Sequence, residues 1–310
     1  MPFDRRAIPR GLLFDCWTAP DGRAMRRFHW AQPDGRPPRG RLLFQTGRAD
    51  FAEKYLETIA HWHAAGWDVT GFDWRGQGGS RGDGDGDGTG TSARGIEAML
   101  DDLRGFVRDW RRTDGVRHVA VGHSMGGHLL LRLLAERDVG IDRAVLVAPM
   151  LGLNSRPLPP MLAAGIARAA QRMGQGDRPL AHRRTAAIGR QGRLTGDADR
   201  YADETHWVGL HPAYRVVPPR WGWVAGAYRS IARLQAPGVL EGIAVPTLLV
   251  GTERDRLIDP RAIRAAAARM PAATLVMRTD GAHELLREVD AVRDAVLARI
   301  DAFLTEEDGG

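Results

Sequence analysis

The sequence predicts an α/β fold in which a mostly parallel, eight-stranded sheet carries helices on both faces and an inserted helical cap. Short apolar runs alternate with longer helical patterns along most of the 310 residues, as expected of strands joined by crossover helices. The run Ala144–Val147 is apolar without alternation, which is typical of a strand buried on both faces. The alternation stops between Leu151 and Leu240, where we expect the insertion.

The opening strands follow one another directly, so we expect them to pair antiparallel. Later strands alternate with helices, which predicts parallel pairing because each parallel connection needs a crossover. The expected strands, in order, are Leu12–Trp17, Met25–Ala31, Arg41–Thr46, Trp67–Asp73, His118–Gly122, Arg143–Val147, Pro246–Gly251 and Thr274–Met277. The expected helices are Phe51–Ala65, Ala93–Arg111, Met125–Arg137, Arg261–Arg269 and Glu284–Leu304.

We expect residues 1–150 and 241–310 to form the sheet domain, and residues 151–240 to form the cap. The cap holds 13 arginines against five acidic residues, so it carries the whole of the net charge of +6. Within it, Arg168 and Arg172 flank an apolar stripe at helical spacing, which predicts an amphipathic helix. The stripe consists of Met161, Leu162, Gly165, Ile166, Ala169, Ala170 and Met173.

The composition favours a cytoplasmic protein. No apolar run approaches the ~20 residues that cross a bilayer, and the first residues lack the features of a secretory signal. The single cysteine, Cys16, cannot form an internal disulfide, which fits a reducing compartment. Apart from Lys54 every basic residue is arginine, a bias of usage that we do not take as evidence for nucleic acid.

A nucleophilic serine is predicted at Ser124. The motif Gly122-His123-Ser124-Met125-Gly126 follows a short apolar run and precedes an apolar helical start. This strand–turn–helix context is the one in which a Gly-x-Ser-x-Gly motif presents its serine on a sharp turn. The glycines allow the strand and the helix to approach closely, and the helix points its amino-terminal amides at the reacting atoms.

A base and an acid are expected after two later strands. His283 follows the strand at Thr274–Met277, and the carboxyl end of a parallel strand is where such folds gather functional side chains. Asp255 follows the strand at Pro246–Gly251, with Asp259 and Glu253 as alternatives. The chain order serine, acid, histidine fits the same strand–turn–helix architecture.

The oxyanion formed during attack needs two backbone amides. One is the amide of Met125, directly after the serine. The other is expected in the loop after the strand Arg41–Thr46, at Gly47 or Arg48.

Four stretches of the chain resemble the monoacylglycerol lipase and lysophospholipase branch of the α/β-hydrolases, and within it the lysophospholipase L2-like group of serine aminopeptidase S33 type. The Arg-Gly-Gln-Gly-x-Ser sequence at 75–80 is fairly specific to this branch. The four stretches are Gly47-Arg48 with Lys54-Tyr55, Asp73–Ser80, Gly122–Gly127 and Asp280–Glu288.

This resemblance implies hydrolysis of a single-chain lipid ester, a monoacylglycerol or a lysophospholipid. It assigns Ser124, Asp255 and His283 to a catalytic triad, and Arg48 with Met125 to the oxyanion hole. The chain has Thr46-Gly47 where lipases of this branch often have His-Gly, so the loop must be supported differently. Peptidase or thioesterase activity, or lipid binding without catalysis, stay open because fold does not decide substrate.

Three weaker patterns in the sequence bear on which ligands the protein binds. The repeat Asp83–Gly88 matches the start of a calcium loop, but Arg94 stands at its twelfth position, so we expect a solvated loop and no metal or cofactor. Aromatic residues of the cap are expected to line the substrate pocket, and the basic cap favours contact with an anionic membrane surface or a phosphate headgroup. The aromatic residues are Trp207, Trp221 and Trp223.

Overall fold

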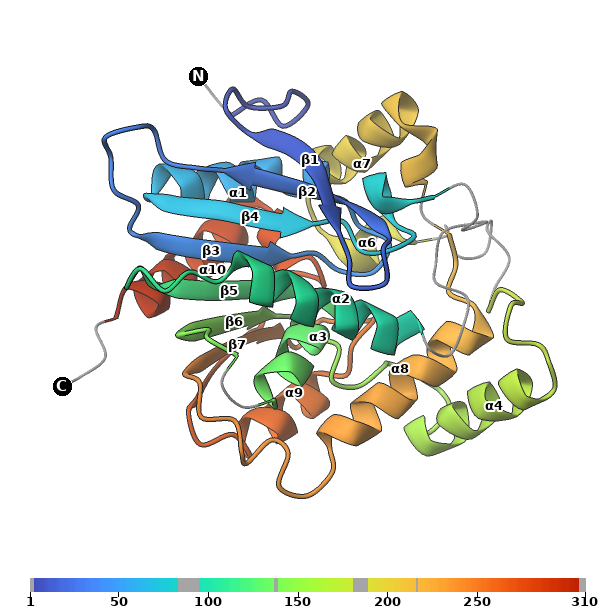
Figure 1. Ribbon diagram of the computed structural model, residues 1–310. Helices are drawn as coiled ribbons and strands as arrows, with labels where there is room; N and C mark the ends of the chain where they lie inside the picture. The colour runs from blue at the N-terminus through green and yellow to red at the C-terminus, as the bar shows by residue number, and fades with distance from the viewer. Residues whose placement is uncertain (1–2, 83–94, 137–138, 181–188, 216, 307–310) are drawn as a thin grey trace.

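The computed structural model describes residues 3–82, 95–136, 139–180, 189–215 and 217–306 (Figure 1). The repeat at 83–88 lies outside these ranges. Within them, no group of three or more His, Cys, Asp or Glu side chains is placed to hold a metal ion. The strands are β1 Leu13–Thr18, β2 Ala24–Trp30, β3 Gly40–Gln45, β4 Trp67–Phe72, β5 His118–His123, β6 Arg143–Val147, β7 Thr247–Thr252 and β8 Ala273–Arg278.

These strands form one sheet in the order β1-β2-β4-β3-β5-β6-β7-β8. The β1–β2 and β2–β4 pairs are antiparallel and every other pair is parallel, which confirms the predicted antiparallel start and the mostly parallel remainder. The carboxyl ends of the parallel strands therefore lie along one edge of the sheet, on the right in Figure 1.

Helices cover both faces of the sheet (Figure 1). Side chains of β5 alternate between two apolar cores, with Val119 and Val121 in one and Ala120 in the other. The first core is closed by α1 (Leu56–Ala64) and α10 (Asp290–Thr305). The second is closed by α2 (Gly95–Trp110), α3 (Met125–Leu134) and α9 (Pro260–Ala267).

The stretch between β6 and β7 leaves this layered pattern, and we call residues 151–240 the cap segment. Its helices lie beyond the carboxyl edge of the parallel strands (Figure 1). They are α4 Pro160–Arg172, α6 Gln191–Leu194, α7 Ala198–Leu210 and α8 Trp221–Leu234, with the short 3₁₀ helix η3 at Pro212–Tyr214.

The expected helix Glu284–Leu304 is wrong at its start. The chain instead makes a 3₁₀ turn, η4 (Leu285–Arg287), and the helix α10 begins only at Asp290. The cause is Glu288, whose carboxylate turns back to accept hydrogen bonds from the Ala282 amide at 2.6 Å and the Gly196 amide at 3.0 Å. The helix expected at Phe51–Ala65 likewise opens with a 3₁₀ turn, η1 (Ala52–Tyr55), before α1.

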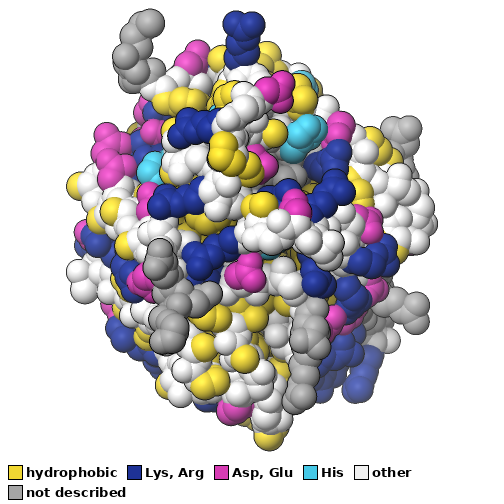
Figure 2. Space-filling model, turned by 60° about the vertical axis from the view of Figure 1, so that its left-hand side comes forward, with side chains coloured by type: hydrophobic (Ala, Val, Ile, Leu, Met, Phe, Trp, Pro, Cys, Tyr) yellow, Lys and Arg dark blue, Asp and Glu magenta, His cyan; other side chains and the backbone are white. Residues whose placement is uncertain are grey.

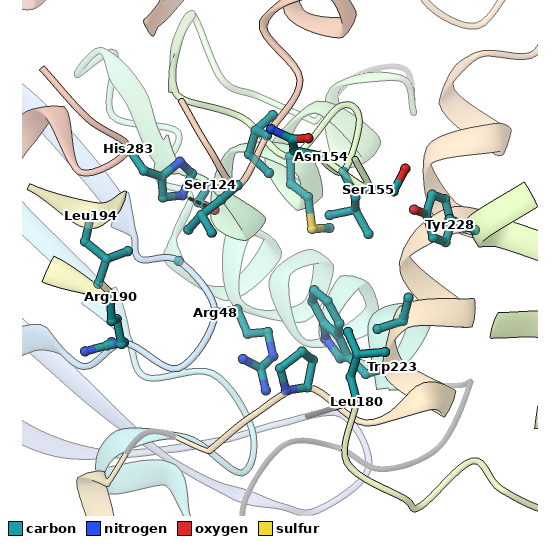
Figure 3. Close-up of a pocket in the computed structure, with 18 of the residues that line it drawn as sticks. Arg48, Ser124, Asn154, Ser155, Leu180, Arg190, Leu194, Trp223, Tyr228 and His283 are labelled. Carbon is teal, nitrogen blue, oxygen red and sulfur yellow. Dashed lines mark hydrogen bonds between the residues drawn. The ribbon is translucent and has the colours of Figure 1, made fainter. Parts of the chain in front are cut away.

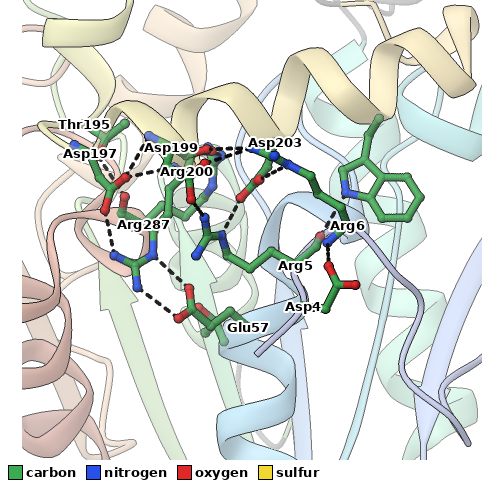
Figure 4. A network of polar contacts seen from close by, with 12 residues as sticks. Asp4, Arg5, Arg6, Glu57, Thr195, Asp197, Asp199, Arg200, Asp203 and Arg287 are labelled. Atoms are coloured by element: carbon green, nitrogen blue, oxygen red, sulfur yellow. Dashed lines mark hydrogen bonds and ion pairs between the residues drawn. The ribbon is translucent and has the colours of Figure 1, made fainter. Parts of the chain in front are cut away.

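Helix α7 is fastened to the sheet domain by ion pairs (Figure 4). Arg5 and Arg6 of the amino-terminal segment both bind Asp203, at 2.7 and 2.9 Å. Arg200 donates to both carboxylate oxygens of Glu57, which lies on α1, at 2.8 and 2.9 Å. Helix α4 packs chiefly against α8, another helix of the cap segment. Helices α4 and α7 therefore differ in how directly they are tied to the sheet domain.

Several surface arginines are paired with carboxylates, such as Arg104 with Glu136 and Arg269 with Glu241. On the face in Figure 2, basic and acidic side chains are interspersed and apolar side chains reach the surface between them.

Among the residues that the structure describes, none of the helices combines the length and apolar character needed to cross a bilayer.

Candidate active site

Ser124 occupies a sharp turn between β5 and α3. Its φ of 52° lies in the left-handed region, which costs free energy for a residue with a Cβ. The turn is held because the Ser124 amide donates to Val147 O at 2.9 Å and the Ser124 carbonyl accepts from the His128 amide at 3.0 Å. The serine side chain is thereby presented at the carboxyl edge of the sheet.

The glycines around this serine are required by close backbone contacts. A Cβ on Gly126 would lie 2.5 Å from Thr46 O, and one on Gly122 would lie 2.7 Å from the Gly127 Cα. Both distances are shorter than real Cβ contacts, and the atoms that would have to move are backbone. The close approach of α3 to the end of β3 brings the turn at Ser124 beside the loop that follows β3.

The structure brings Ser124, His283 and Asp255 together in one hydrogen-bonded chain. His283 Nε2 lies 2.9 Å from Ser124 Oγ, and His283 Nδ1 lies 2.6 Å from Asp255 Oδ2. The other carboxylate oxygen of Asp255 accepts from the amides of Leu257 and Ile258 at 2.8 and 2.9 Å. All three members of the chain are buried, so the contacts lie in a region of low dielectric.

The charges in this chain stabilise one another. Burial acts to lower the pKa of His283, but the carboxylates of Asp255, Glu284 and Asp50 together outweigh it and raise that pKa above its ordinary value. Burial acts to raise the pKa of Asp255, whereas His283 and the backbone amides hold it below the usual range. Asp255 is therefore ionised near neutral pH and can fix the orientation and tautomer of the imidazole.

The two alternative acids lie elsewhere. Asp259 caps the amino terminus of α9, where its side chain accepts from the Arg261 amide at 3.1 Å. Glu253 is exposed and forms an ion pair with Arg264. Of the three carboxylates considered from the sequence, Asp255 is the one bonded to His283.

The loop after β3 contains both amides considered for the oxyanion hole, those of Gly47 and Arg48. The Gly47 amide donates to Asp50 Oδ2 at 3.1 Å, so it is already engaged within the loop. The Arg48 amide follows directly in the same loop, and it stays the predicted partner of the Met125 amide at the start of α3. The sequence alone had left Gly47 and Arg48 as alternatives.

The stretch Asp73–Ser80 supports the loop after β3. Trp74 Nε1 donates to Thr46 O at 2.8 Å, and Gln77 Oε1 accepts from the Ala49 amide. Asp73 Oδ1 accepts from the Ala52 amide at 3.0 Å. The sequence marked this stretch as a signature, but its role follows only from contacts across the sheet.

A cavity of about 460 Å³ opens over Ser124 (Figure 3). Arg48 and Arg190 lie on one side of it, whereas Leu180 and Tyr228 lie on the other (Figure 3). Its volume falls in the range of small-molecule sites, and most of its wall is apolar. The apolar lining includes Met150, Leu153, Leu158, Ala163, Ile166, Leu180, Leu194, Trp221, Trp223, Val224, Leu257 and Ile258.

Two of the three predicted aromatic residues line the cavity. Trp221 and Trp223 belong to its wall, and the Arg48 guanidinium lies 5.0 Å from the centre of the Trp223 ring. Trp207 is not among the described lining residues, so its expected role is corrected. It is buried under the amino-terminal segment, where its Nε1 donates to Arg5 O at 3.2 Å.

His123, which directly precedes the serine, also lines the cavity. Burial, together with the charge of His283, lowers the pKa of His123 to about 4, so the ring is neutral near pH 7. Its Nδ1 lies 3.3 Å from Val147 O and its ring centre lies 5.0 Å from that of His283. The His123 ring therefore packs beside the ring of His283 and adds no second positive charge.

Comparison with known proteins gives matches along nearly the whole chain. A profile of the family described as serine aminopeptidase, S33, matches residues 36–290. The probable lysophospholipase L2 of Haemophilus influenzae is 28% identical over 286 residues, covering 89% of this chain and 87% of that protein. Lysophospholipase L2 of Escherichia coli K12 is 30% identical over 277 residues, covering 83% and 78%.

Solved structures share the same fold at lower identity. A soluble variant of monoglyceride lipase from Saccharomyces cerevisiae superposes with a TM-score of 0.78 at 17% identity, covering 98% of this chain and 97% of that one. The monoacylglycerol lipase of Paleococcus ferrophilus superposes with a TM-score of 0.69 at 18% identity, covering 91% and 98%.

Proposed function

Because the chain belongs to the serine aminopeptidase S33 family of α/β-hydrolases, we propose that it is a serine carboxylic ester hydrolase acting on a single-chain lipid ester. The observation that carries the proposal is the contact of 2.9 Å between Ser124 Oγ and His283 Nε2 at the base of an apolar cavity. A hydroxyl becomes a nucleophile when a neutral imidazole within this distance can take its proton.

In the proposed reaction, His283 accepts the proton of Ser124 as the serine oxygen bonds to the ester carbonyl carbon. Asp255 holds the imidazole and stabilises the imidazolium that forms. The amides of Arg48 and Met125 donate to the oxyanion, each contributing about 2.7–4 kcal/mol to transition-state stabilisation. The ester C–O bond then breaks, and His283 returns its proton to the departing alcohol.

Deacylation follows the same route with water as the nucleophile. Water attacks the acyl-serine carbonyl while His283 accepts its proton. The carboxylic acid is released when the serine C–O bond breaks, and His283 returns the proton to Ser124. The sequence of bonds made and broken needs no cofactor.

The shape and polarity of the cavity support a substrate with one apolar chain. Apolar side chains of β-strand loops and of the cap segment form most of the wall, while Asn154, Ser155 and the two arginines offer polar groups near the serine. One relative is named lysophospholipase L2, and a protein of the same fold is named monoglyceride lipase. A lysophospholipid and a monoglyceride each carry one acyl chain. We therefore place monoacylglycerols and lysophospholipids first among candidate substrates.

A substrate panel on the purified full-length protein tests the proposal. We expect hydrolysis of monoacylglycerols or lysophospholipids with kcat/KM at least tenfold above that for aminoacyl anilides, because the cavity wall is apolar. The panel includes short p-nitrophenyl esters and acyl thioesters.

Other outcomes of the panel contradict the proposal in distinct ways. Preferential cleavage of anilides indicates a peptidase, and preferential cleavage of thioesters indicates a thioesterase. A folded protein whose Ser124 is not labelled by a fluorophosphonate probe is a lipid-binding protein without this chemistry.

The outer face of α4 supports contact with a lipid surface. Met161 is 89% exposed and Met173 is 68% exposed, although both are apolar. Ile166, on the same helix, is both exposed and part of the cavity wall, so the apolar face continues into the cavity. Arg168, Arg172, Arg229 and Gln171 line a shallow hollow of about 390 Å³ beside it. Basic groups beside an apolar helical face are typical of binding to anionic membrane surfaces.

We expect Met161→Asp combined with Met173→Asp to lower binding to anionic phospholipid vesicles at least fivefold in a flotation assay. Added salt should weaken binding of the original protein because screening reduces its electrostatic part. Leu210→Asp is the matched control, since Leu210 is 58% exposed on α7, a different helix of the cap segment. Equal binding by all three proteins, or equal binding to uncharged vesicles, contradicts a role for this face.

A further inference from the structure

The single lysine of the chain lies in the interior beside the candidate active site. The Lys54 side chain is 1% exposed, and its Nζ binds three carboxylates. It forms an ion pair with Asp50, and lies 3.0 Å from Glu284 Oε1 and 3.2 Å from Glu204 Oε2. A buried ammonium group is costly unless it is paired, so these contacts strongly constrain the three segments that supply the carboxylates.

One of the carboxylates belongs to the loop that carries the Arg48 amide. Asp50 Oδ2 accepts from the Gly47 amide at 3.1 Å and from the Tyr55 hydroxyl at 2.9 Å, while Oδ1 is bound by Lys54. The Lys54–Asp50 pair thus helps to set the backbone of this loop, whose amides must point at the oxyanion.

The second carboxylate directly follows His283. The amide of Glu284 donates to Leu194 O at 2.7 Å, and its carboxylate binds Lys54 and Arg287. The third carboxylate, Glu204, lies on α7 of the cap segment and also binds Arg190 at 2.7 Å. Lys54 therefore contacts carboxylates from the loop of the Arg48 amide, from the loop of His283 and from the cap segment.

We propose that Lys54 is a positioning residue for hydrolysis: it joins the loop of the Arg48 amide to the loop of His283, and its charge offsets the carboxylates that flank His283. The inference rests on the ester hydrolase activity proposed above. Lys54 itself is not among the described residues that line the cavity, so it acts through Asp50 and Glu284 rather than on substrate.

The charges of Lys54 and Glu284 are expected to change the pKa of His283 in opposite directions. Glu284 and Asp50 each add to the effect of Asp255 in raising the pKa of His283. Removing the Lys54 charge leaves Asp50 without this ion pair and Glu284 with Arg287 alone, so the imidazole should hold its proton to higher pH. Removing the Glu284 charge should have the opposite effect.

The charged or titratable groups around His283 come from several elements. They are Asp255 after β7, His123 at the end of β5, Asp50 and Lys54 after β3, Glu284 and Arg287 on its own loop, and Arg190 and Glu204 from the cap segment.

The experiment compares the original protein with Lys54→Met, Lys54→Arg and Glu284→Gln. Two readouts are taken for each: kcat and KM for a short p-nitrophenyl ester from pH 5 to 9, and the titration of the His283 ring by NMR. The NMR titration needs no catalytic activity. Failure of the original protein to hydrolyse any ester thus rejects the proposed function, whereas the titration decides the effect of Lys54 on His283.

We expect Lys54→Met to lower kcat about tenfold with KM changed less than about threefold. The reason is that the loop of the Arg48 amide loses the Lys54–Asp50 ion pair that positions it. The ratio of its activity at pH 6 to that at pH 8 should fall about fivefold as the titration of His283 moves to higher pH. In Glu284→Gln the titration should move to lower pH, and Lys54→Arg should restore the position found in the original protein. A purely structural role cannot produce shifts of opposite sign.

Arg200→Met is the matched control, because Arg200 is also buried among three carboxylates, those of Glu57, Asp197 and Asp290. It should lower the Tm and leave the pH profile unchanged. Unchanged titration in both Lys54→Met and Glu284→Gln, or shifts in the same direction, overturns the inference. If Lys54→Met does not fold, Glu284→Gln alone decides, and absence of a downward shift overturns it.

Discussion

Replacing Ser124 by alanine is expected to lower kcat for ester hydrolysis by about 10⁶-fold and to abolish fluorophosphonate labelling. Loss of the nucleophile of a hydrogen-bonded triad removes as much rate as loss of the whole triad, because the members act as a unit. The residual rate, about 10³-fold or more above that in water, comes from the oxyanion amides and from binding.

Binding of the acyl chain should survive this change. Ser124 presents one hydroxyl at the base of a cavity whose wall is mostly apolar, so its loss removes little contact area. The measurement is steady-state hydrolysis of a lysophospholipid or monoacylglycerol, together with the dissociation constant of a non-hydrolysable single-chain ether lipid. We expect the two proteins to differ less than about fourfold in that constant, because even a contact as large as one buried methylene, ~0.8 kcal/mol, corresponds to only that factor.

Ser230→Ala is the matched control for this experiment. Ser230 is fully buried in α8 and bonded to His128 at 2.8 Å, and it is not among the described lining residues. This variant should keep the labelling of the original protein. Hydrolysis by Ser124→Ala within tenfold of the original rate means that another residue attacks the ester, and the proposed mechanism is then wrong.

The positions of Ser124, His283 and Asp255 were open to prediction because each follows an apolar strand, buried in β5 and β7 and half-buried in β8. Apolar runs without alternation identify such strands, and parallel strands end at a common edge. Residues more than a hundred positions apart could thus be assigned to one site from local pattern alone. The alternatives Asp259 and Glu253 could not be separated in this way, since they lie on the same loop and differ only in where the loop turns them.

What could not be predicted depends on which segments cover one another. Helical spacing indicates that Trp207 shares a face with its neighbours, but it does not indicate that the amino-terminal segment covers that face. Likewise no local pattern shows that carboxylates at 50, 204 and 284 converge on Lys54. The late start of the expected last helix has the same origin, because the Glu288 carboxylate accepts a hydrogen bond from the Gly196 amide of the cap segment.

The second large effect is expected for Asp255→Asn, which should lower kcat about 10⁴-fold. The oxygen of Asp255 that accepts from the amides of Leu257 and Ile258 can be retained by the asparagine carbonyl. The new NH₂ group then faces His283 Nδ1, which must accept a hydrogen bond. The ring proton moves to Nε2, and in that tautomer the imidazole cannot take the proton of Ser124.

This variant should also change the dependence on pH. The Asp255 carboxylate is the main interaction that raises the pKa of His283 against the effect of burial. Without it the pKa of His283 falls, so the acid limb of the residual activity should move to lower pH. The measurement is kcat/KM against pH, which reports groups of the free enzyme.

The stability of the fold should respond in a defined pH range. Asp255, whose pKa is lowered on folding, contributes stability above its unfolded pKa of about 3.9 and loses it as pH falls through its folded pKa. His283, whose pKa is raised on folding, contributes fully below about 6.5 and loses this contribution as pH rises through its folded pKa. The Tm of Asp255→Asn should therefore fall further below that of the original protein at pH 5.5 than at pH 8.5.

Asp259→Asn separates this electrostatic argument from a general effect of losing a carboxylate after β7. Asp259 caps α9, and asparagine caps a helix about as well as aspartate, so stability should be almost unchanged. Its carboxylate bonds to Arg261 rather than to the imidazole, so activity should also be retained. Equal losses in Asp255→Asn and Asp259→Asn contradict the assignment, because only one of these carboxylates lies 2.6 Å from His283 Nδ1 and can hold its proton there.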